Sequence, residues 1–152
     1  MNLYIVRHAH AENGGPDSER RLSQHGQEFM KEQIPKWKRS ISNVDLILSS
    51  PYKRALETAE YIHKGFDVKH ELIIEQSLQP IMNIPDLIIT LSSFSVKNIL
   101  VVGHMPDVAE LTSLLVSSNN IELLFTPGTI AALEFKENIS LYRGKLRFIL
   151  NN

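Results

Sequence analysis

The chain places an arginine and a histidine, Arg7 and His8, directly after its first apolar run at residues 3–6. A second apolar run, at residues 99–102, is followed two residues later by His104. Short runs rich in Tyr, Ile and Val are typical of buried strands. Open α/β sheets bind their ligands at the carboxyl ends of their strands. We therefore expect the two imidazoles to meet at one edge of a sheet and to act there on a phosphate group.

A third chemical group lies in the segment 49–59, which reads SSPYKRALETA and follows a strand-like run. Its two serines and Pro51 predict the start of a helix, with the proline in the first turn. Arg54 falls within that turn. A helix N-terminus attracts anions through its free N–H groups and its dipole, and a guanidinium group binds two phosphate oxygens at once. The segment therefore predicts an arginine that binds phosphate.

Together these residues predict phosphoryl transfer to a histidine. A neutral His8 would attack phosphorus through one ring nitrogen, and water would then hydrolyse the phosphohistidine. Arg7, Arg54 and His104 would offset the charge on the equatorial phosphate oxygens. The nearby arginines disfavour an imidazolium ion, which keeps His8 nucleophilic near neutral pH. Because the same arginines would repel a cation, we expect neither a metal nor another cofactor.

The elements that must position these residues alternate along the chain. Strands are predicted at residues 3–6, 44–48, 72–74, 99–102, 130–135 and 145–150. Helices are predicted to begin at or near Ser23, Pro51, Pro85 and Pro106. This order predicts an α/β fold, a three-layer αβα sandwich whose mainly parallel central sheet carries helices on both faces. The last strand is expected at a sheet edge, and a single domain is expected to span residues 1–152.

Composition limits the classes of function. The chain has 152 residues, 43% of them hydrophobic and 22% charged, as in soluble globular proteins of one domain. The 16 basic and 17 acidic residues argue against a broad surface for nucleic acid. The absence of cysteine excludes a disulfide framework and thiolate chemistry. With no signal-peptide pattern and no apolar run long enough for a bilayer, we expect a cytoplasmic protein without a membrane partner.

Four motifs make the chain similar to the histidine phosphatase superfamily. Residues 7–12 read RHAHAE, where the superfamily has Arg-His-Gly and its small phosphohistidine phosphatase branch has Arg-His-Ala. Residues 20–26, RRLSQHG, resemble the branch's Arg-Pro-Leu-Thr-x-x-Gly, although Arg21 replaces the proline, an exchange expected to alter only the loop. The segments 49–59 and 102–106 complete the set. The resemblance covers nearly the whole chain and implies the phosphoglycerate mutase-like fold.

The resemblance also implies roles for individual residues. By it, His8 is the phosphorylated nucleophile, and Arg7, Arg54 and His104 form the phosphate pocket. Arg20 matches a basic residue that flanks the site, with a solvated loop arginine as the alternative. The implied enzyme is a phosphatase that uses no metal.

The residues also bear on the substrate. Mutases and many phosphomonoesterases of the superfamily carry a glutamate proton donor in the region of residues 77–83, which here reads SLQPIMN. A departing alkoxide needs that proton, whereas an imidazole leaving from phosphohistidine needs it less, because the P–N bond is labile. The short chain also leaves little room for a lid over a metabolite. Both features favour a phosphohistidine on a phosphotransfer or signalling protein. Glu12 and Asp107 are candidate proton donors, with positioning or helix-start roles as the alternative.

Other functions stay open at this point. A broad-specificity phosphomonoesterase acting on a small metabolite would need Glu12 or Asp107 as its acid. A binding module without turnover is disfavoured by the intact pocket residues, and a mutase by its need for a closed site. Of the remaining histidines, His10 is expected in a loop near the site and the others at the surface: His25, His63 and His70. Candidates for the mouth of the site, or for ordinary packing, are Tyr52, Met82 and Met105.

Overall fold

The computed structural model describes residues 1–151 and contains a six-stranded mixed sheet. Its strands are β1 (Asn2–Arg7), β2 (Leu46–Ser49), β3 (Ile73–Ile74), β4 (Asn98–Gly103), β5 (Ile130–Glu134) and β6 (Lys145–Leu150). They lie in the order β3-β2-β4-β1-β5-β6. The first four strands in this order run parallel, whereas β5 pairs antiparallel with β1, and β6 antiparallel with β5. The predicted mainly parallel sheet is confirmed, with β6 at its edge.

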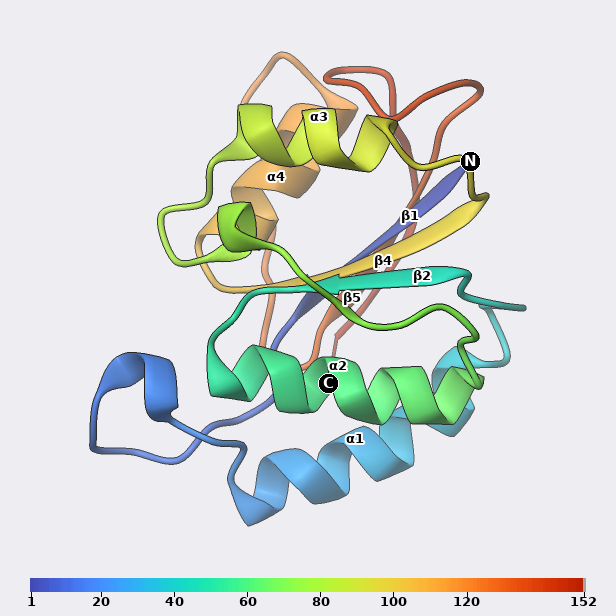
Figure 1. Cartoon of the computed structure of the whole chain (residues 1–152). Helices are drawn as coiled ribbons and strands as arrows, with labels where there is room; N and C mark the ends of the chain where they lie inside the picture. The colour runs from blue at the N-terminus through green and yellow to red at the C-terminus, as the bar shows by residue number, and fades with distance from the viewer. Residues whose placement is uncertain (152) are drawn as a thin grey trace.

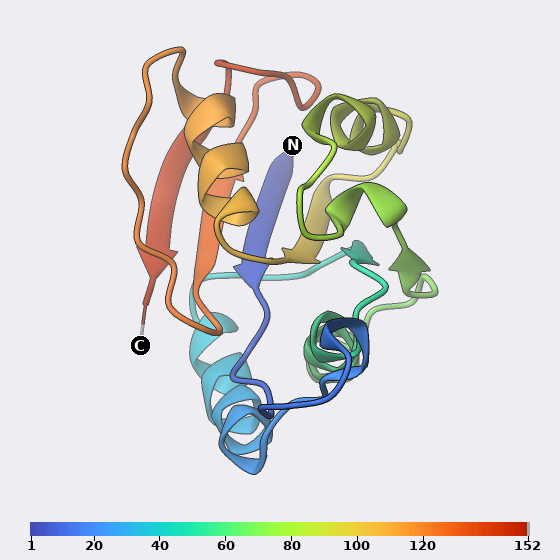
Figure 2. The ribbon, with the colours of Figure 1, turned by 90° about the vertical axis from the view of Figure 1, so that its left-hand side faces the viewer.

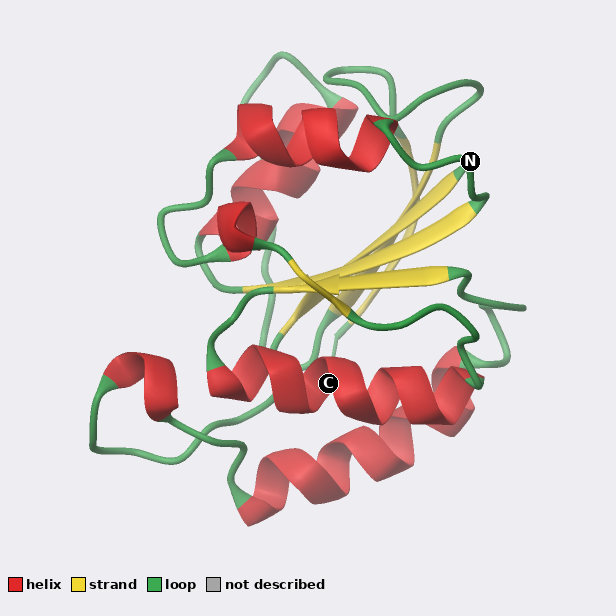
Figure 3. Cartoon of the chain, in the orientation of Figure 1, coloured by secondary structure: helices red, strands yellow, loops and turns green. Residues whose placement is uncertain are grey.

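Helices cover both faces of the sheet, as predicted. One face carries α1 (Gln24–Trp37) and α2 (Lys53–Phe66), and the other carries α3 (Ile84–Ser92) and α4 (Asp107–Val116) (Figures 1 and 3). Two short 3-10 turns, η1 (Asp17–Glu19) and η2 (Gln76–Leu78), lie in the connections. Within residues 1–151, no helix is both long enough and apolar enough to cross a membrane.

The two helical layers explain why the first strand is a continuous apolar run. Tyr4 and Val6 belong to the core on the α1 and α2 face, whereas Leu3 and Ile5 belong to the core on the α3 and α4 face. Successive side chains of a strand point to opposite faces, so a strand covered on both sides must be apolar at every position. Because both faces of β1 are buried, the position of its last residue, and therefore of Arg7 and His8, is fixed by the core.

The helix starts were predicted with mixed success. Ser23 caps α1 as predicted, because its side chain accepts a hydrogen bond from the Gly26 N–H at 3.1 Å. The prediction for α2 was wrong, since the helix begins at Lys53 and Pro51 lies before its first turn. Ser50 therefore does not cap the helix, and its hydroxyl lies in the site instead.

Candidate active site

The ends of β1 and β4 bring the two predicted imidazoles together. The strands are parallel neighbours, and the His8 N–H donates to the Gly103 carbonyl at 3.0 Å. The ring centroids of His8 and His104 lie 5.1 Å apart. Figure 2 shows the ends of both strands close together, with η1, η2 and the start of α4 around them.

The two ring nitrogens of His8 have different partners. Its Nδ1 lies 2.7 Å from the Ala9 carbonyl oxygen, which can only accept, so this nitrogen carries the proton. Its Nε2 lies 3.1 Å from Nε of Arg54, whose N–H donates to it. This hydrogen-bond pattern leaves the lone pair on Nε2 and makes that atom the nucleophile of the site.

Burial is the main reason why His8 stays neutral. Burial, the largest effect, and the positive charges of Arg54, Arg7 and Arg20 lower the pKa of His8 from 6.5 to about 4, although the hydrogen bond to Ala9 works in the opposite direction. The sequence led us to credit the arginines first, but their contribution is the smaller one. At neutral pH the imidazole is therefore uncharged and able to attack phosphorus.

Arg54 is held by an acidic residue that the sequence analysis did not identify, Asp17 in η1. The two terminal nitrogens of Arg54 donate to the Asp17 carbonyl at 2.6 Å and to the Asp17 carboxylate at 3.1 Å. The other carboxylate oxygen accepts from Arg20 at 3.1 Å. Burial raises the pKa of Asp17, but the hydrogen bonds and charges of Arg54 and Arg20 outweigh it and hold that pKa below its ordinary value. One carboxylate thus fixes both arginines; its only sequence signal is an acid three residues before Arg20.

Two buried nitrogen atoms of the site have no hydrogen-bond partner. Among residues 1–151, Arg7 Nε and His104 Nδ1 are the only buried side-chain nitrogen or oxygen atoms that lack a hydrogen bond. Leaving such an atom unpaired costs roughly 1–3 kcal/mol, so each case calls for an explanation. Both belong to residues that the sequence analysis assigned to the phosphate pocket. Each of these nitrogens could contact a phosphate oxygen, Arg7 Nε as a donor and His104 Nδ1 when it carries the ring proton.

Ser50 sets the orientation of His104. The Tyr52 N–H donates to the Ser50 hydroxyl at 3.3 Å, and that hydroxyl lies 2.8 Å from His104 Nε2. Burial, followed by the charges of His8 and Arg54, lowers the pKa of His104 to about 3, so the ring is neutral. If the hydroxyl donates to Nε2, the ring proton lies on Nδ1 and makes it a donor toward the site.

The two residues of α2 at positions 57 and 58 bind two loops of the site. Thr58 accepts a hydrogen bond from the Ala9 N–H at 3.1 Å and donates to the Arg54 carbonyl at 2.7 Å. Glu57 accepts from the Leu22 N–H at 2.7 Å and from Arg21. Residues 57 and 58 therefore hold the loop that follows His8 and the RRLS segment (residues 20–23) against the same helix that carries Arg54.

The glycine of the second motif has a steric reason. A Cβ atom built on Gly26 would lie 2.1 Å from the His10 carbonyl oxygen, a distance that no side chain can adopt. That carbonyl also accepts from the Ser23 N–H at 3.0 Å. The start of α1 is thus packed directly against the loop that leaves His8.

The other predicted site residues occupy different places. Asp107 is buried, and its two carboxylate oxygens accept from the backbone N–H groups of Met82 at 3.1 Å and Ile81 at 3.3 Å. Glu12 is exposed, and its carbonyl accepts from Arg20 Nε at 2.7 Å. Arg20 itself lies beside the site through Asp17, as described above.

The histidines other than His8 and His104 have partners outside the phosphate pocket. His10 lies in the loop after His8, with its Nδ1 2.7 Å from the Ser23 hydroxyl, and its ring is edge-on to His25. His63 Nε2 contacts the His70 carbonyl at 2.9 Å. Within residues 1–151, no group of three or more His, Cys, Asp or Glu side chains is arranged to hold a metal ion.

The three residues suggested for the mouth of the site occupy different positions. The Tyr52 ring lies edge-on to His104 with centroids 5.2 Å apart, and the Arg54 guanidinium lies 5.1 Å from the centroid of the same ring. Met82 and Met105 are half-buried and pack on the core below α3 and α4. Tyr52 therefore borders the site directly.

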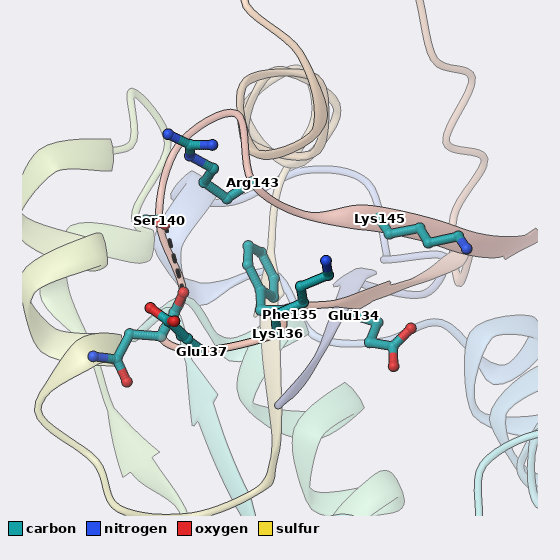
Figure 4. A pocket seen from close by; sticks show the side chains of 8 residues that line it. Glu134, Phe135, Lys136, Glu137, Ser140, Arg143 and Lys145 are labelled. Carbon is teal, nitrogen blue, oxygen red and sulfur yellow. Dashed lines mark hydrogen bonds between the residues drawn. The ribbon is translucent and has the colours of Figure 1, made fainter.

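A pocket of about 570 Å³ lies near the end of the sheet where β1 begins, away from the strand ends that carry His8 and His104 (Figure 4). It is lined by residues at the end of β5 and the start of β6, among them Glu134, Glu137, Arg143 and Lys145. Glu134 pairs with Asn2 at the beginning of β1, so the pocket lies far along the strands from His8. It contains no histidine and no unsatisfied buried donor among the residues that line it.

Comparison with known proteins gives consistent results. Residues 3–81, which include His8 and Arg54, match the model of the histidine phosphatase superfamily (branch 1). The chain is 34% identical over 151 residues to the phosphohistidine phosphatase SixA homolog of Haemophilus influenzae, with 92% of each chain covered.

Solved structures share the fold. The protein histidine phosphatase SixA in complex with tungstate superposes with a TM-score of 0.86 at 22% identity, covering 99% of this chain and 97% of that one. A mycobacterial glucosyl-3-phosphoglycerate phosphatase gives a TM-score of 0.71 at 14% identity, with 96% of both chains covered. The same fold thus supports different substrates, and the substrate has to be argued from the site.

Proposed function

This chain belongs to the histidine phosphatase superfamily, and we propose that it removes phosphate from a histidine of a phosphotransfer or signalling protein through a covalent phosphohistidine on His8. One observation carries the proposal. His8 Nε2 carries no proton and its lone pair accepts from Arg54, and the same site holds the only two buried side-chain nitrogen or oxygen atoms without a partner among residues 1–151, on Arg7 and His104.

The first step transfers the phosphoryl group to the enzyme. His8 Nε2 attacks phosphorus, and the P–N bond to the substrate's imidazole breaks, with the electron pair going to the leaving ring nitrogen. When the other nitrogen of that ring already carries a proton, the ring departs as neutral imidazole and no enzyme acid is required. Arg7, Arg54 and His104 donate to the phosphoryl oxygens during transfer.

The second step releases phosphate. Water attacks phosphorus, the bond to His8 Nε2 breaks, and the electron pair returns to that nitrogen. The protons of the water leave with the phosphate product, so His8 is neutral again. Throughout, the hydrogen bond from Nδ1 to the Ala9 carbonyl keeps the ring in one tautomer.

The lack of a free acidic side chain in the site supports a phosphohistidine substrate. Both oxygens of Asp107 are engaged by backbone N–H groups, and Glu12 is an exposed loop residue whose backbone serves Arg20. Asp17 is held below its ordinary pKa by two arginines and is a poor acid. A site without a ready proton donor suits a phosphoramidate leaving group better than an alkoxide.

The experiment is to trap the intermediate. A histidine phosphotransfer domain carrying ³²P-phosphohistidine is mixed with enzyme and quenched in alkali, where phosphohistidine is stable, and the labelled peptide of the enzyme is identified. We expect label on His8, none in His8→Ala, and wild-type labelling in Arg143→Ala, which alters the distant pocket. Phosphate release without a labelled enzyme would contradict the covalent mechanism.

A further inference from the structure

Ile81 is an unusual residue at the border of the active site. It is a β-branched residue with a positive φ of 65°, and 94% of its surface is exposed. Such a conformation is strained for a β-branched residue, and it persists only where the surroundings enforce it. Here the carboxylate of Asp107 enforces it by accepting from the N–H groups of Ile81 and Met82.

Asp107 connects this strained residue to the site. It is buried and lies three residues after His104, at the start of α4. The segment carrying Ile81 is therefore tied to the same turn that delivers the catalytic imidazole. The strained conformation does not bury the Ile81 side chain in the protein core, because that side chain faces solvent.

Leu124 occupies a corresponding place on another segment. It is 70% exposed, whereas the next residue, Phe125, is buried. The Phe125 carbonyl accepts a hydrogen bond from the Arg7 guanidinium at 2.6 Å. In Figure 2 the segment before β5, which carries Leu124, and the segment after β3, which carries Ile81, lie on opposite sides of the end of β1.

Single exposed apolar residues are common on protein surfaces and need no explanation. These two differ because each is one residue or one hydrogen bond away from a group that holds the catalytic machinery. The site to which both residues are linked contains the guanidinium groups of Arg7, Arg54 and Arg20, the last two paired with Asp17, and this charge suits one phosphate group. A free phosphorylated metabolite would use this site alone, whereas a folded protein would also cover the apolar side chains around it.

We propose that Ile81 and Leu124 form a two-point docking surface for a folded protein domain that presents phosphohistidine with apolar side chains beside it. The inference rests on the proposed function and extends it to the way in which the substrate is recognised. The phosphate is held by the arginines and His104, and the surface around the phosphohistidine is held by the isoleucine and the leucine.

The test separates docking from chemistry. Initial rates are measured with a phosphorylated helical histidine phosphotransfer domain and with free phosphohistidine, for wild type, Ile81→Asp and Leu124→Asp. We expect each variant to raise KM for the domain at least about tenfold and to leave kcat/KM for free phosphohistidine within about twofold. Ile89→Asp is the matched control, because Ile89 on α3 is also 70% exposed, and it should change neither substrate.

A second variant, Ile81→Gly, removes any ambiguity about folding. Glycine adopts a positive φ without strain, so Tm should rise while KM for the domain also rises. A structural role for the side chain would move stability and KM together for the worse. Unchanged KM for the domain in both aspartate variants, or equal losses on both substrates, would overturn the docking proposal. Wild-type enzyme that fails on the domain would instead overturn the proposed function and the docking surface with it.

Discussion

The two edges of the sheet differ in how their polar groups are satisfied. Where β1 and β4 end, two buried nitrogens lack partners, two imidazoles are kept neutral, and an isoleucine is strained. At the opposite edge, the pocket of about 570 Å³ is lined by charged groups of which Glu134 forms an ion pair with Arg147. Unpaired buried nitrogens and shifted pKa values, more than the volume of a pocket, therefore identify the active site.

The largest contrast between the edges is expected from matched arginine substitutions. Arg54→Ala removes the guanidinium beside His8 and should lower kcat/KM about a thousandfold, the order found when a charge-stabilising donor is deleted. Arg54→Lys keeps the charge without the planar fork and should recover only part of the loss. Arg143→Ala at the opposite edge should leave kcat/KM unchanged. A comparable loss in both alanine variants would contradict the assignment of the site.

Glycine substitutions give the next largest effect, on stability. Gly26→Ala should destabilise the fold by about 3 kcal/mol, because its Cβ would meet a backbone oxygen at 2.1 Å. In Gly144→Ala the nearest atom is the end of the Phe135 ring at 2.9 Å, so we expect a smaller cost. Chemical denaturation measures both. Equal costs would mean that the loop after His8 yields more easily than its hydrogen bonds imply.

Asp17 tests whether the arginines need their carboxylate. Asp17→Asn weakens the hydrogen bonds to Arg54 and Arg20, so kcat/KM should fall by on the order of tenfold, in line with 1.5–3 kcal/mol for hydrogen bonds to charged groups. Glu137→Gln, in the distant pocket, is the control and should have no effect. An increase in activity would show that the carboxylate competes with phosphate instead of positioning the arginines.

The smallest effect is an expected absence of titration. With a pKa of about 4, His8 should remain neutral from pH 8 to about pH 5, whereas a free histidine titrates near 6.5. Nitrogen-edited NMR of the ring should show a proton on Nδ1 and none on Nε2 over this range. A midpoint near 6.5 would contradict the burial of the nucleophile.

The same shift has a consequence for stability. The unfolded chain protonates His8 and His104 near pH 6.5, but the native state resists protonation down to about pH 4 and about pH 3, respectively. The unfolded state thus binds more protons in this window, so stability should be full above pH 6.5 and fall as the pH drops below it. His8→Asn should reduce that slope, which urea titrations at several pH values would show.

The sequence predicted the convergence of His8, Arg54 and His104 because parallel strand ends share one edge of a sheet. It did not reveal Asp17, since the loop of residues 10–23 has no periodicity and only the fold brings that carboxylate to Arg54. The two serines before Pro51 were predicted to start the helix, but α2 begins at Lys53 and the Ser50 hydroxyl contacts His104. The dominance of burial over the arginines in the pKa of His8 also depends on packing, which no local pattern records.

The most direct test of the account is phosphate release from a phosphohistidine-bearing domain and from p-nitrophenyl phosphate, measured side by side with wild type and His8→Ala. The account predicts a strong preference for the phosphohistidine domain and loss of release from it in His8→Ala. Ester hydrolysis that equals or exceeds phosphohistidine hydrolysis, or release from the domain that survives the loss of His8, would contradict it.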